Sequence, residues 1–267
     1  GTKETKAGSA VEAEAIFKTY SRGAETTRDN WVYDFSADSL AIKMKRMIET
    51  YNSEIARWIR AGCPRDIDNF VLTDDAKIKW SSGLKEYFTR QMQAVFSSKS
   101  IRNAMYRPFT KQYIYFNHIM THRQGVFSRV FPTSASEAEN SVICVTDLGA
   151  EKPFMTFFSN TIPDLHLVGA GAATQSFPFY VYDEDGSNRR ENITDWALAQ
   201  FQAAYVDVTK RDIFHYVYGL LHHPHYRAHY ADNLKRELPR IPLIGTQIPS
   251  ADPVGDFRRF VEAGAAL

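Results

Sequence analysis

The middle of this 267-residue chain consists of short runs of aromatic and β-branched residues, and this pattern constrains the fold more than any other feature. Pro, Gly, Ser and Asn separate the runs, as is typical of β-strands joined by turns. No long helical pattern lies between them, which favours a mostly antiparallel or mixed sheet over a nucleotide-binding βαβ unit. The predicted strands span residues 111–116, 141–145, 154–158, 165–168 and 177–182.

Apolar residues at helical spacing flank these runs on both sides. The clearest case begins near Ser36 and ends near Arg60, where Gly62 and Pro64 terminate it. Thr209, with Asp212 three residues later, resembles a capping box that opens another helix. Further helices are expected at residues 11–20, 81–94, 194–201, 224–234 and 252–264.

The order of these elements predicts an α+β chain. Residues 1–10 are small and polar and are expected to be a flexible lead-in. Residues 11–98 are expected to form a helical spacer. Residues 99–267 are expected to form a mixed or antiparallel sheet domain flanked by C-terminal helices.

Composition excludes several classes of protein. Two cysteines, Cys63 and Cys144, make neither a disulfide framework nor a metal site and fit a reducing cytoplasm. No run approaches the roughly 20 apolar residues of a membrane span, so no membrane partner is expected. The net charge of +1 means that any affinity for nucleic acid must come from a local patch.

Such a patch is present in the sequence. Between Tyr87 and Ser136 there is no Asp or Glu, and aromatic residues alternate with basic ones. Uncompensated cations attract polyanions, and the aromatic rings could stack on bases. The alternative is that folding brings acids close to this window and that its aromatic residues belong to a core. The cations of the window are Arg90, Lys99, Arg102, Arg107, Lys111, Arg123 and Arg129.

No catalytic or cofactor motif is recognisable. Gly169 and Gly171 form an isolated G-x-G that lacks a third glycine and a following helix, so no cofactor is expected. Asp164 could orient His166, although a structural histidine is the simpler interpretation. Four histidines between His222 and His229 lack Glu or Cys at ligand spacing, so no metal is expected.

A resemblance adds to this interpretation. The segment AIFKTYSRGAETTRDNWVY (15–33) resembles the segment that follows the methyltransferase core in Type ISP restriction–modification enzymes. Other blocks agree in order over nearly the whole chain. They are YRPFTKQYIY (106–115), SVICV (141–145), IPDLH (162–166), FPFYVY (177–182), DIFHYVY (212–218) and LHHPHYRAHYADNLKRELPRIP (221–242).

The resemblance implies that the chain is the C-terminal target recognition region of a bacterial, cytoplasmic enzyme. In that family a nuclease, a helicase-like ATPase, a coupler and an adenine methyltransferase precede this region in one polypeptide. The Asn-Pro-Pro-Tyr methyltransferase motif and the Walker lysine are absent here. The implied function is therefore sequence-specific binding of double-stranded DNA. The implied partners are the methyltransferase and helicase domains of the same polypeptide, and the chain itself is not expected to be an enzyme.

The basic window overlaps the expected recognition domain. Its guanidinium groups could contact phosphates or guanine, and its glutamines could read adenine. The segment from His118 to Ser136 is the preferred base-reading loop, because long ordered loops are usually functional. For any single arginine, phosphate contact or solvation is the simpler interpretation. The candidate contacts are Lys99, Arg102, Arg107, Lys111, Arg123, Gln124, Arg129 and Gln175.

Two alternatives remain open. One is a small-molecule enzyme that uses Asp164, His166 and the His222–His229 region. The other is a docking module that holds neighbouring domains together without binding DNA. A steep salt dependence of DNA binding would favour target recognition over both.

Overall fold

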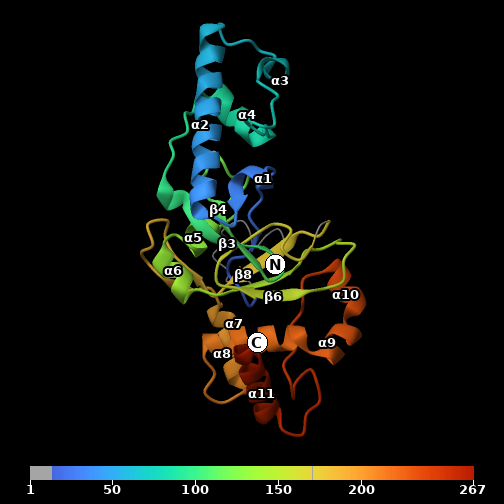
Figure 1. The fold of residues 1–267 in the computed structure, drawn as a ribbon. Helices are drawn as coiled ribbons and strands as arrows, with labels where there is room; N and C mark the ends of the chain where they lie inside the picture. Colours follow the sequence, from blue (N-terminus) through green and yellow to red (C-terminus); the bar gives the residue numbers. More distant parts are fainter. Residues whose placement is uncertain (1–13, 170) are drawn as a thin grey trace. The chain divides into compact units, whose positions relative to one another are not determined.

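The fold is described from a computed structural model, which covers residues 14–169 and 171–267 (Figure 1). The chain forms two compact units, and it passes between them four times. We call residues 23–127 and 161–167 the hairpin unit. The sheet unit comprises the described residues among 1–22, 128–160 and 168–267. The domain boundary expected at residue 99 lies inside the hairpin unit, so it differs from the boundaries between the two compact units. The expected lead-in at 1–10 lies outside the described residues.

The long helix of the hairpin unit is α2 (Ala37–Arg60), close to the span that the sequence predicts. Ser36 caps it by accepting a 3.2 Å hydrogen bond from the backbone N–H of Ser39. One face of α2 is buried, and α4 (Ser82–Thr89) packs its own apolar face in the same core. The aromatic residues of this core are Tyr51, Trp58, Trp80 and Phe88. The helix α4 ends sooner than expected from the sequence. Two other short helices here are α1 (Asp29–Val32) and α3 (Ile67–Phe70).

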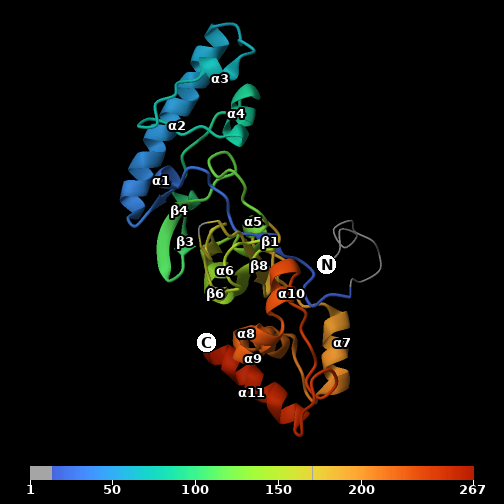
Figure 2. The ribbon, with the colours of Figure 1, turned by 90° about the vertical axis from the view of Figure 1, so that its right-hand side faces the viewer.

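A four-stranded sheet lies at the N-terminal end of α2 (Figures 1 and 2). Its centre is a hairpin of β3 (Ile101–Arg107) and β4 (Thr110–Tyr115), with β2 (Tyr33–Asp34) antiparallel to β4. A short parallel strand, β7 (Ile162–Pro163), pairs with β3. The 3₁₀ turn η2 (Ser98–Ser100) leads into β3. The sequence predicts β4 but misses β3, because polar residues interrupt the apolar pattern of β3.

The sheet unit contains a second four-stranded sheet in the order β1-β8-β5-β6, entirely antiparallel. Its central strand β5 is buried at every position. After β8 in the chain, β9 and β10 form a separate two-stranded antiparallel ribbon. The strands are β1 (Ser21–Arg22), β5 (Val142–Thr146), β6 (Thr156–Ser159), β8 (Thr174–Pro178), β9 (Tyr180–Val181) and β10 (Arg190–Glu191).

Helices of the C-terminal half pack together in the sheet unit, and their apolar faces share a core with β5 (Figure 1). The capping box of Thr209 and Asp212 is confirmed at the start of α8. The remaining helices are α5 (Phe127–Val130), α6 (Ser134–Glu139), α7 (Asp195–Ala204), α8 (Lys210–His222), α9 (Pro224–His229), α10 (Ala231–Arg236) and α11 (Pro253–Ala266). Within the described residues, no helix combines the length and apolar character needed to span a bilayer.

Two local predictions are wrong. Residues 14–20 are not helical, and Phe17 instead forms a β-bridge with Ile193 of the sheet unit. Residues 165–168 do not form a strand, because the carboxylate of Asp164 accepts the backbone N–H of His166 at 2.8 Å and the chain turns there. The apolar composition of this run reflects burial of Leu167 and Val168, not strand pairing.

Candidate nucleic-acid interface

The β3–β4 hairpin is the part of the basic window with the clearest geometry. It contains no acidic residue from position 101 to position 115, and it carries Arg102, Arg107 and Lys111. Lys111 is exposed and Arg102 is half-buried, while Lys99 is exposed in the turn just before β3. A two-stranded ribbon fits the width of a DNA major groove, so the hairpin has both the charge and the size for a groove contact.

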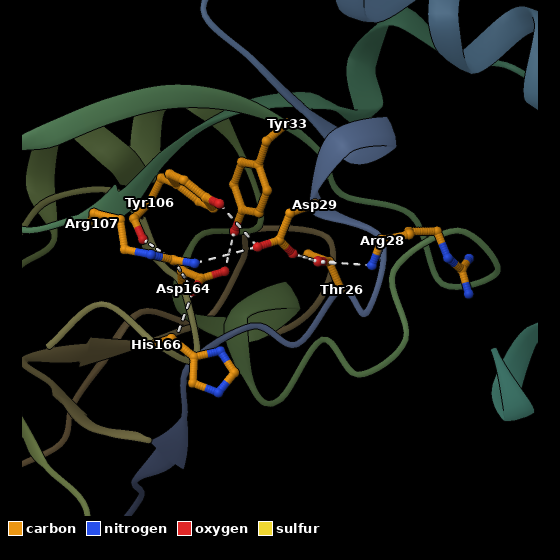
Figure 3. A network of polar contacts seen from close by, with 8 residues as sticks. All are labelled: Thr26, Arg28, Asp29, Tyr33, Tyr106, Arg107, Asp164 and His166. Carbon is orange, nitrogen blue, oxygen red and sulfur yellow. Dashed lines mark hydrogen bonds and ion pairs between the residues drawn. The ribbon is translucent and has the colours of Figure 1, made fainter. Parts of the chain in front are cut away.

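Arg107 is held at the end of β3 by two carboxylates (Figure 3). Its guanidinium donates to Asp164 Oδ1 at 2.6 Å and lies 3.4 Å from Asp29 Oδ2. The same group lies over the ring of Tyr106, 3.9 Å from the ring centroid. These contacts engage Nη1, Nη2 and one face of the Arg107 guanidinium and tie the end of β3 to Asp164 and Asp29.

Two tyrosine hydroxyls complete this network. Tyr33 donates to Asp164 Oδ2 at 2.9 Å, and Tyr106 donates to Asp29 Oδ2 at 3.1 Å. The two rings pack against each other with centroids 4.6 Å apart. Since the carboxylate of Asp164 is almost fully buried, its hydrogen bonds from Tyr33, Arg107 and the His166 backbone are needed to offset lost hydration.

Burial dominates the electrostatics of this network. Removal from water raises the pKa of the Asp164 carboxyl, although the His166 backbone N–H and the charge of Arg107 act in the opposite direction. Burial and the neighbouring Asp164 also hold the pKa of Tyr33 well above its usual range. The phenol of Tyr33 therefore stays protonated and donates throughout the physiological range.

A pocket of about 460 Å³ adjoins the network, entirely within the hairpin unit. Both acidic and basic groups line it, including Asp29, Asp75, Lys79 and His166. The imidazole of His166 is turned away from the carboxylate of Asp164 (Figure 3), so the pair does not form a catalytic dyad.

Arg28 forms the buried wall of this pocket. It is 3% exposed, and burial lowers its pKa to about 10. Its guanidinium donates to the carbonyl of Met120 at 3.0 Å and to the hydroxyl of Ser81. These contacts tie the segment before α1 to α4 and to residues 117–121. No sequence signal identified Arg28, because its partners are distant in the chain.

Arg123 is an accessible predicted contact in the hairpin unit, with 72% of its side chain exposed. Its guanidinium lies 3.3 Å from Glu25 Oε2, and the two backbones form an antiparallel bridge. Gln124 follows it and is half-buried. Thus folding brings an acid to Arg123, as it does to Arg107, and the window is partly neutralised. An exposed pair of this kind contributes little to stability and can exchange for a phosphate.

Two other predicted contacts lie in the sheet unit. Arg129 is exposed in α5, where its carbonyl accepts the N–H of Tyr182 at 2.8 Å. Gln175 is 9% exposed in β8, and its amide donates to Asp147 Oδ1 at 2.9 Å. Because Gln175 is largely buried and its amide is bound to Asp147, it is a poor candidate for a contact with DNA.

The segment from His118 to Ser136 is not an open loop. Ile119, Met120, Phe127 and Phe131 are buried, and α5 and the start of α6 lie within it. The chain also passes from the hairpin unit to the sheet unit after Phe127. Much of the segment is therefore core and connection. Its exposed cations are Arg123 and Arg129.

The histidine region belongs to the sheet unit. Burial lowers the pKa of His222, while His225 and His229 are exposed. Across the described residues, 14–169 and 171–267, no group of three or more His, Cys, Asp or Glu side chains is placed to hold a metal ion. His223 packs its ring against Phe260 of α11, with centroids 5.2 Å apart, which is a structural role.

Comparisons with known proteins identify a family. A model of the Type ISP C-terminal specificity domain matches residues 15–267. A nuclease-deletion mutant of the Type ISP restriction-modification enzyme LlaGI, solved with a DNA substrate mimic, shares 31% identity with a TM-score of 0.78. That match covers 96% of this chain and 22% of that one. No curated protein matches the chain.

Two further solved structures are similar. In a complex of DrdV with DNA, the match has 33% identity and a TM-score of 0.81, and covers 100% of this chain and 24% of that chain. The match to the ATP-dependent Type ISP enzyme LlaBIII bound to DNA has 25% identity and a TM-score of 0.78, and covers 97% of this chain and 16% of that chain. This chain thus spans less than a quarter of the length of each of these proteins.

Proposed function

The chain belongs to the Type ISP C-terminal specificity domain family, and we propose on this premise that it binds duplex DNA and recognises its target sequence. The observation that carries the proposal is the match of a specificity-domain model to residues 15–267. Similar structures that are 25–33% identical were solved with DNA or a DNA mimic, which supports the same function here.

We place the DNA-contacting surface on the basic hairpin and the exposed cations near it in sequence. Lysine and arginine contacts to phosphate release counterions and give affinity without sequence information. Sequence must be read by base-edge contacts from a smaller set of side chains. The proposed contacts of the hairpin unit are Lys99, Arg102, Lys111, Arg123 and Gln124, and Arg129 is a separate proposed contact of the sheet unit.

Arg107 has a different role in this proposal. Since its guanidinium is bound by Asp164 and stacked on Tyr106, it fixes the end of β3 and does not contact DNA. A rigid hairpin loses less conformational entropy on binding than a mobile one, which favours affinity. The buried network is thus a support for the hairpin, which carries Arg102 and Lys111 on its two faces.

We further propose that catalysis resides outside this chain, in the methyltransferase, translocase and nuclease domains of a parent polypeptide. The Asn-Pro-Pro-Tyr motif and the Walker lysine that such reactions need are absent from the sequence. The expected result is that the chain shows no methyl transfer, ATP hydrolysis or DNA cleavage. Turnover by this chain above that of a heat-inactivated sample would contradict this part of the proposal.

A selection experiment tests the function itself. The chain is incubated with a pool of random duplexes at low salt, and the retained DNA is sequenced over several rounds. Enrichment of one sequence motif is expected for a target recognition domain, whereas a docking module retains no DNA. Weak, salt-sensitive binding without a motif would remove the recognition part of the proposal and leave only non-specific binding.

Charge variants locate the surface. The double variant Arg102→Gln, Lys111→Gln should weaken binding and lower the slope of log K against log salt by about two. Lys235→Gln is a matched control, because Lys235 is exposed and paired with Asp232 but lies outside the proposed surface. Equal effects of the double variant and the control would mean that the hairpin does not carry the contact.

A further inference from the structure

Phe109, at the tip of the β3–β4 hairpin, is an unusual exposed aromatic residue. The residue is 90% exposed, compared with 78% for Val95 and 72% for Phe35 in the same unit. Burying a phenylalanine typically gains about 1.5–3 kcal/mol relative to leaving it exposed. A residue that is 90% exposed realises little of this gain in the fold.

The backbone of Phe109 is also unfavourable for this residue type. Its φ is +59°, directly after Pro108, and the turn links Arg107 to Thr110, which pair across the hairpin. A turn with Pro at the second position and a positive φ at the third normally has Gly or Asn there. Bulky residues with positive φ are rare, and those that occur cluster at ligand clamps and functional sites.

The tip is held in place by the network at its base. Arg107, two residues before Phe109, is fixed by Asp164 and by the ring of Tyr106. Thr110, on the other side, donates its hydroxyl to the carbonyl of Pro108 at 3.3 Å. The aromatic ring therefore projects from a supported turn and not from a long loop.

The charge around Phe109 favours a nucleic acid over a protein partner. Residues 101–115 contain no anion, and of their three cations Arg107 is paired with Asp164 and Asp29, while Arg102 and Lys111 are the other two. The cores of protein interfaces are depleted of lysine and of charged residues in general, and their anchoring aromatics lie in well-packed, desolvated pockets. An exposed ring on a hairpin that also carries Arg102 and Lys111 instead matches the combination of stacking and phosphate contact that binds nucleic acids.

We propose that Phe109 is an apolar wedge that stacks on DNA bases and partly unstacks one base step at the bound site. This inference rests on the proposed DNA-binding function and specifies how the hairpin engages the duplex. Side chains such as Phe inserted between base steps kink the duplex and let it wrap more protein surface. Base steps that unstack easily would then be preferred at this position of the target, without a hydrogen bond to any base.

The test compares Phe109→Asn and Phe109→Trp with the unaltered chain. Val95→Asn is the control, because Val95 is a similarly exposed apolar residue outside the hairpin. Each protein is titrated against a duplex recovered from the random pool, in which 2-aminopurine replaces one adenine at a time. The measurements are the dissociation constant, the fluorescence gain of 2-aminopurine on unstacking, and the melting temperature of the free protein.

Phe109→Asn should bind about 5- to 100-fold more weakly, as expected for the loss of one aromatic–base stack. It should also abolish the fluorescence gain, while its melting temperature stays the same or rises because Asn tolerates a positive φ. Phe109→Trp should retain both binding and fluorescence. The opposite signs for stability and binding separate a wedge from a residue needed for folding.

Two outcomes overturn the proposal and differ in what they leave standing. If Phe109→Asn behaves as Val95→Asn does while Arg102→Gln, Lys111→Gln weakens binding, the wedge is wrong and DNA recognition by the hairpin stands. If the unaltered chain binds no duplex at low salt, the proposed function fails and the wedge fails with it.

Discussion

Arg107 and Asp164 form a 2.6 Å ion pair between residues that are 57 positions apart in the chain. The pair ties the end of β3 to the segment that follows β7, and Asp29 adds a contact from the start of α1. Arg107 is 30% exposed and Asp164 is 3% exposed. A cation from the basic window is thus part of the interior support of the hairpin unit.

Removing the charge of Arg107 should destabilise this unit. In Arg107→Met the carboxylate of Asp164 remains buried with Tyr33 and a backbone N–H as its main donors, and breaking a buried pair costs about 3 kcal/mol. Urea unfolding measures the loss. Arg123→Met is the matched control, because its pair with Glu25 is exposed and should contribute less than about 1 kcal/mol. Equal losses for both arginines would show that Asp164 is well solvated without Arg107.

The proposed interface predicts a change in salt dependence when Arg123 and Arg129 are neutralised together. Each phosphate contact contributes about 0.9 to the slope of log K against log salt, so Arg123→Gln, Arg129→Gln should lower the slope by about one to two. Circular dichroism checks that the fold is intact. If the slope and the affinity are both unchanged, these two residues do not face the DNA.

Some elements of this structure could be predicted from local sequence patterns, and others could not. Helix α2 and the capping box of α8 depend on local spacing and short side-chain contacts, so they could be predicted within a few residues. The segment 165–168 has the composition of a strand, but the carboxylate of Asp164 captures the N–H of His166 and turns the chain. A short apolar run of this kind indicates that its residues are buried and does not by itself indicate β-pairing.

The site was harder to predict than the fold. The basic window includes the hairpin, but charge alone does not distinguish Arg107, which is paired with the buried Asp164, from Lys111, which is exposed. The partners of Arg107 come from residues 29 and 164, and no local rule links them. Gln175 illustrates the same limit, because its engagement by Asp147 depends on strand register between β8 and the region after β5.

Close packing of α8 against α11 in the sheet unit predicts a second stability effect. A Cβ on Gly264 would lie 1.9 Å from the backbone oxygen of His215, so both helices would have to move apart. Gly264→Ala should therefore destabilise the chain by about 2–3 kcal/mol, despite the higher helix propensity of alanine. Ala265→Ser, an exposed change at the next position, should alter the unfolding midpoint little. A stabilised Gly264→Ala would mean that the helices separate without loss of packing.

Alkaline pH should unfold the chain through its buried tyrosines. Burial raises the pKa of Tyr218 to about 12, whereas an unfolded tyrosine titrates near its usual value of 10.0. The folded state therefore holds the phenolic proton more tightly, so this stabilisation is complete below pH 10 and declines as the pH rises toward 12. One such group contributes a slope of about 1.4 kcal/mol per pH unit between these values.

In Tyr218→Phe, which keeps the ring contacts with Phe158 and His222, the free energy of unfolding should fall less steeply over this interval. Denaturant titrations at pH 9, 10, 11 and 11.5 measure the slope, and identical slopes in the two proteins would show that Tyr218 ionises as easily in the folded chain as in the unfolded one.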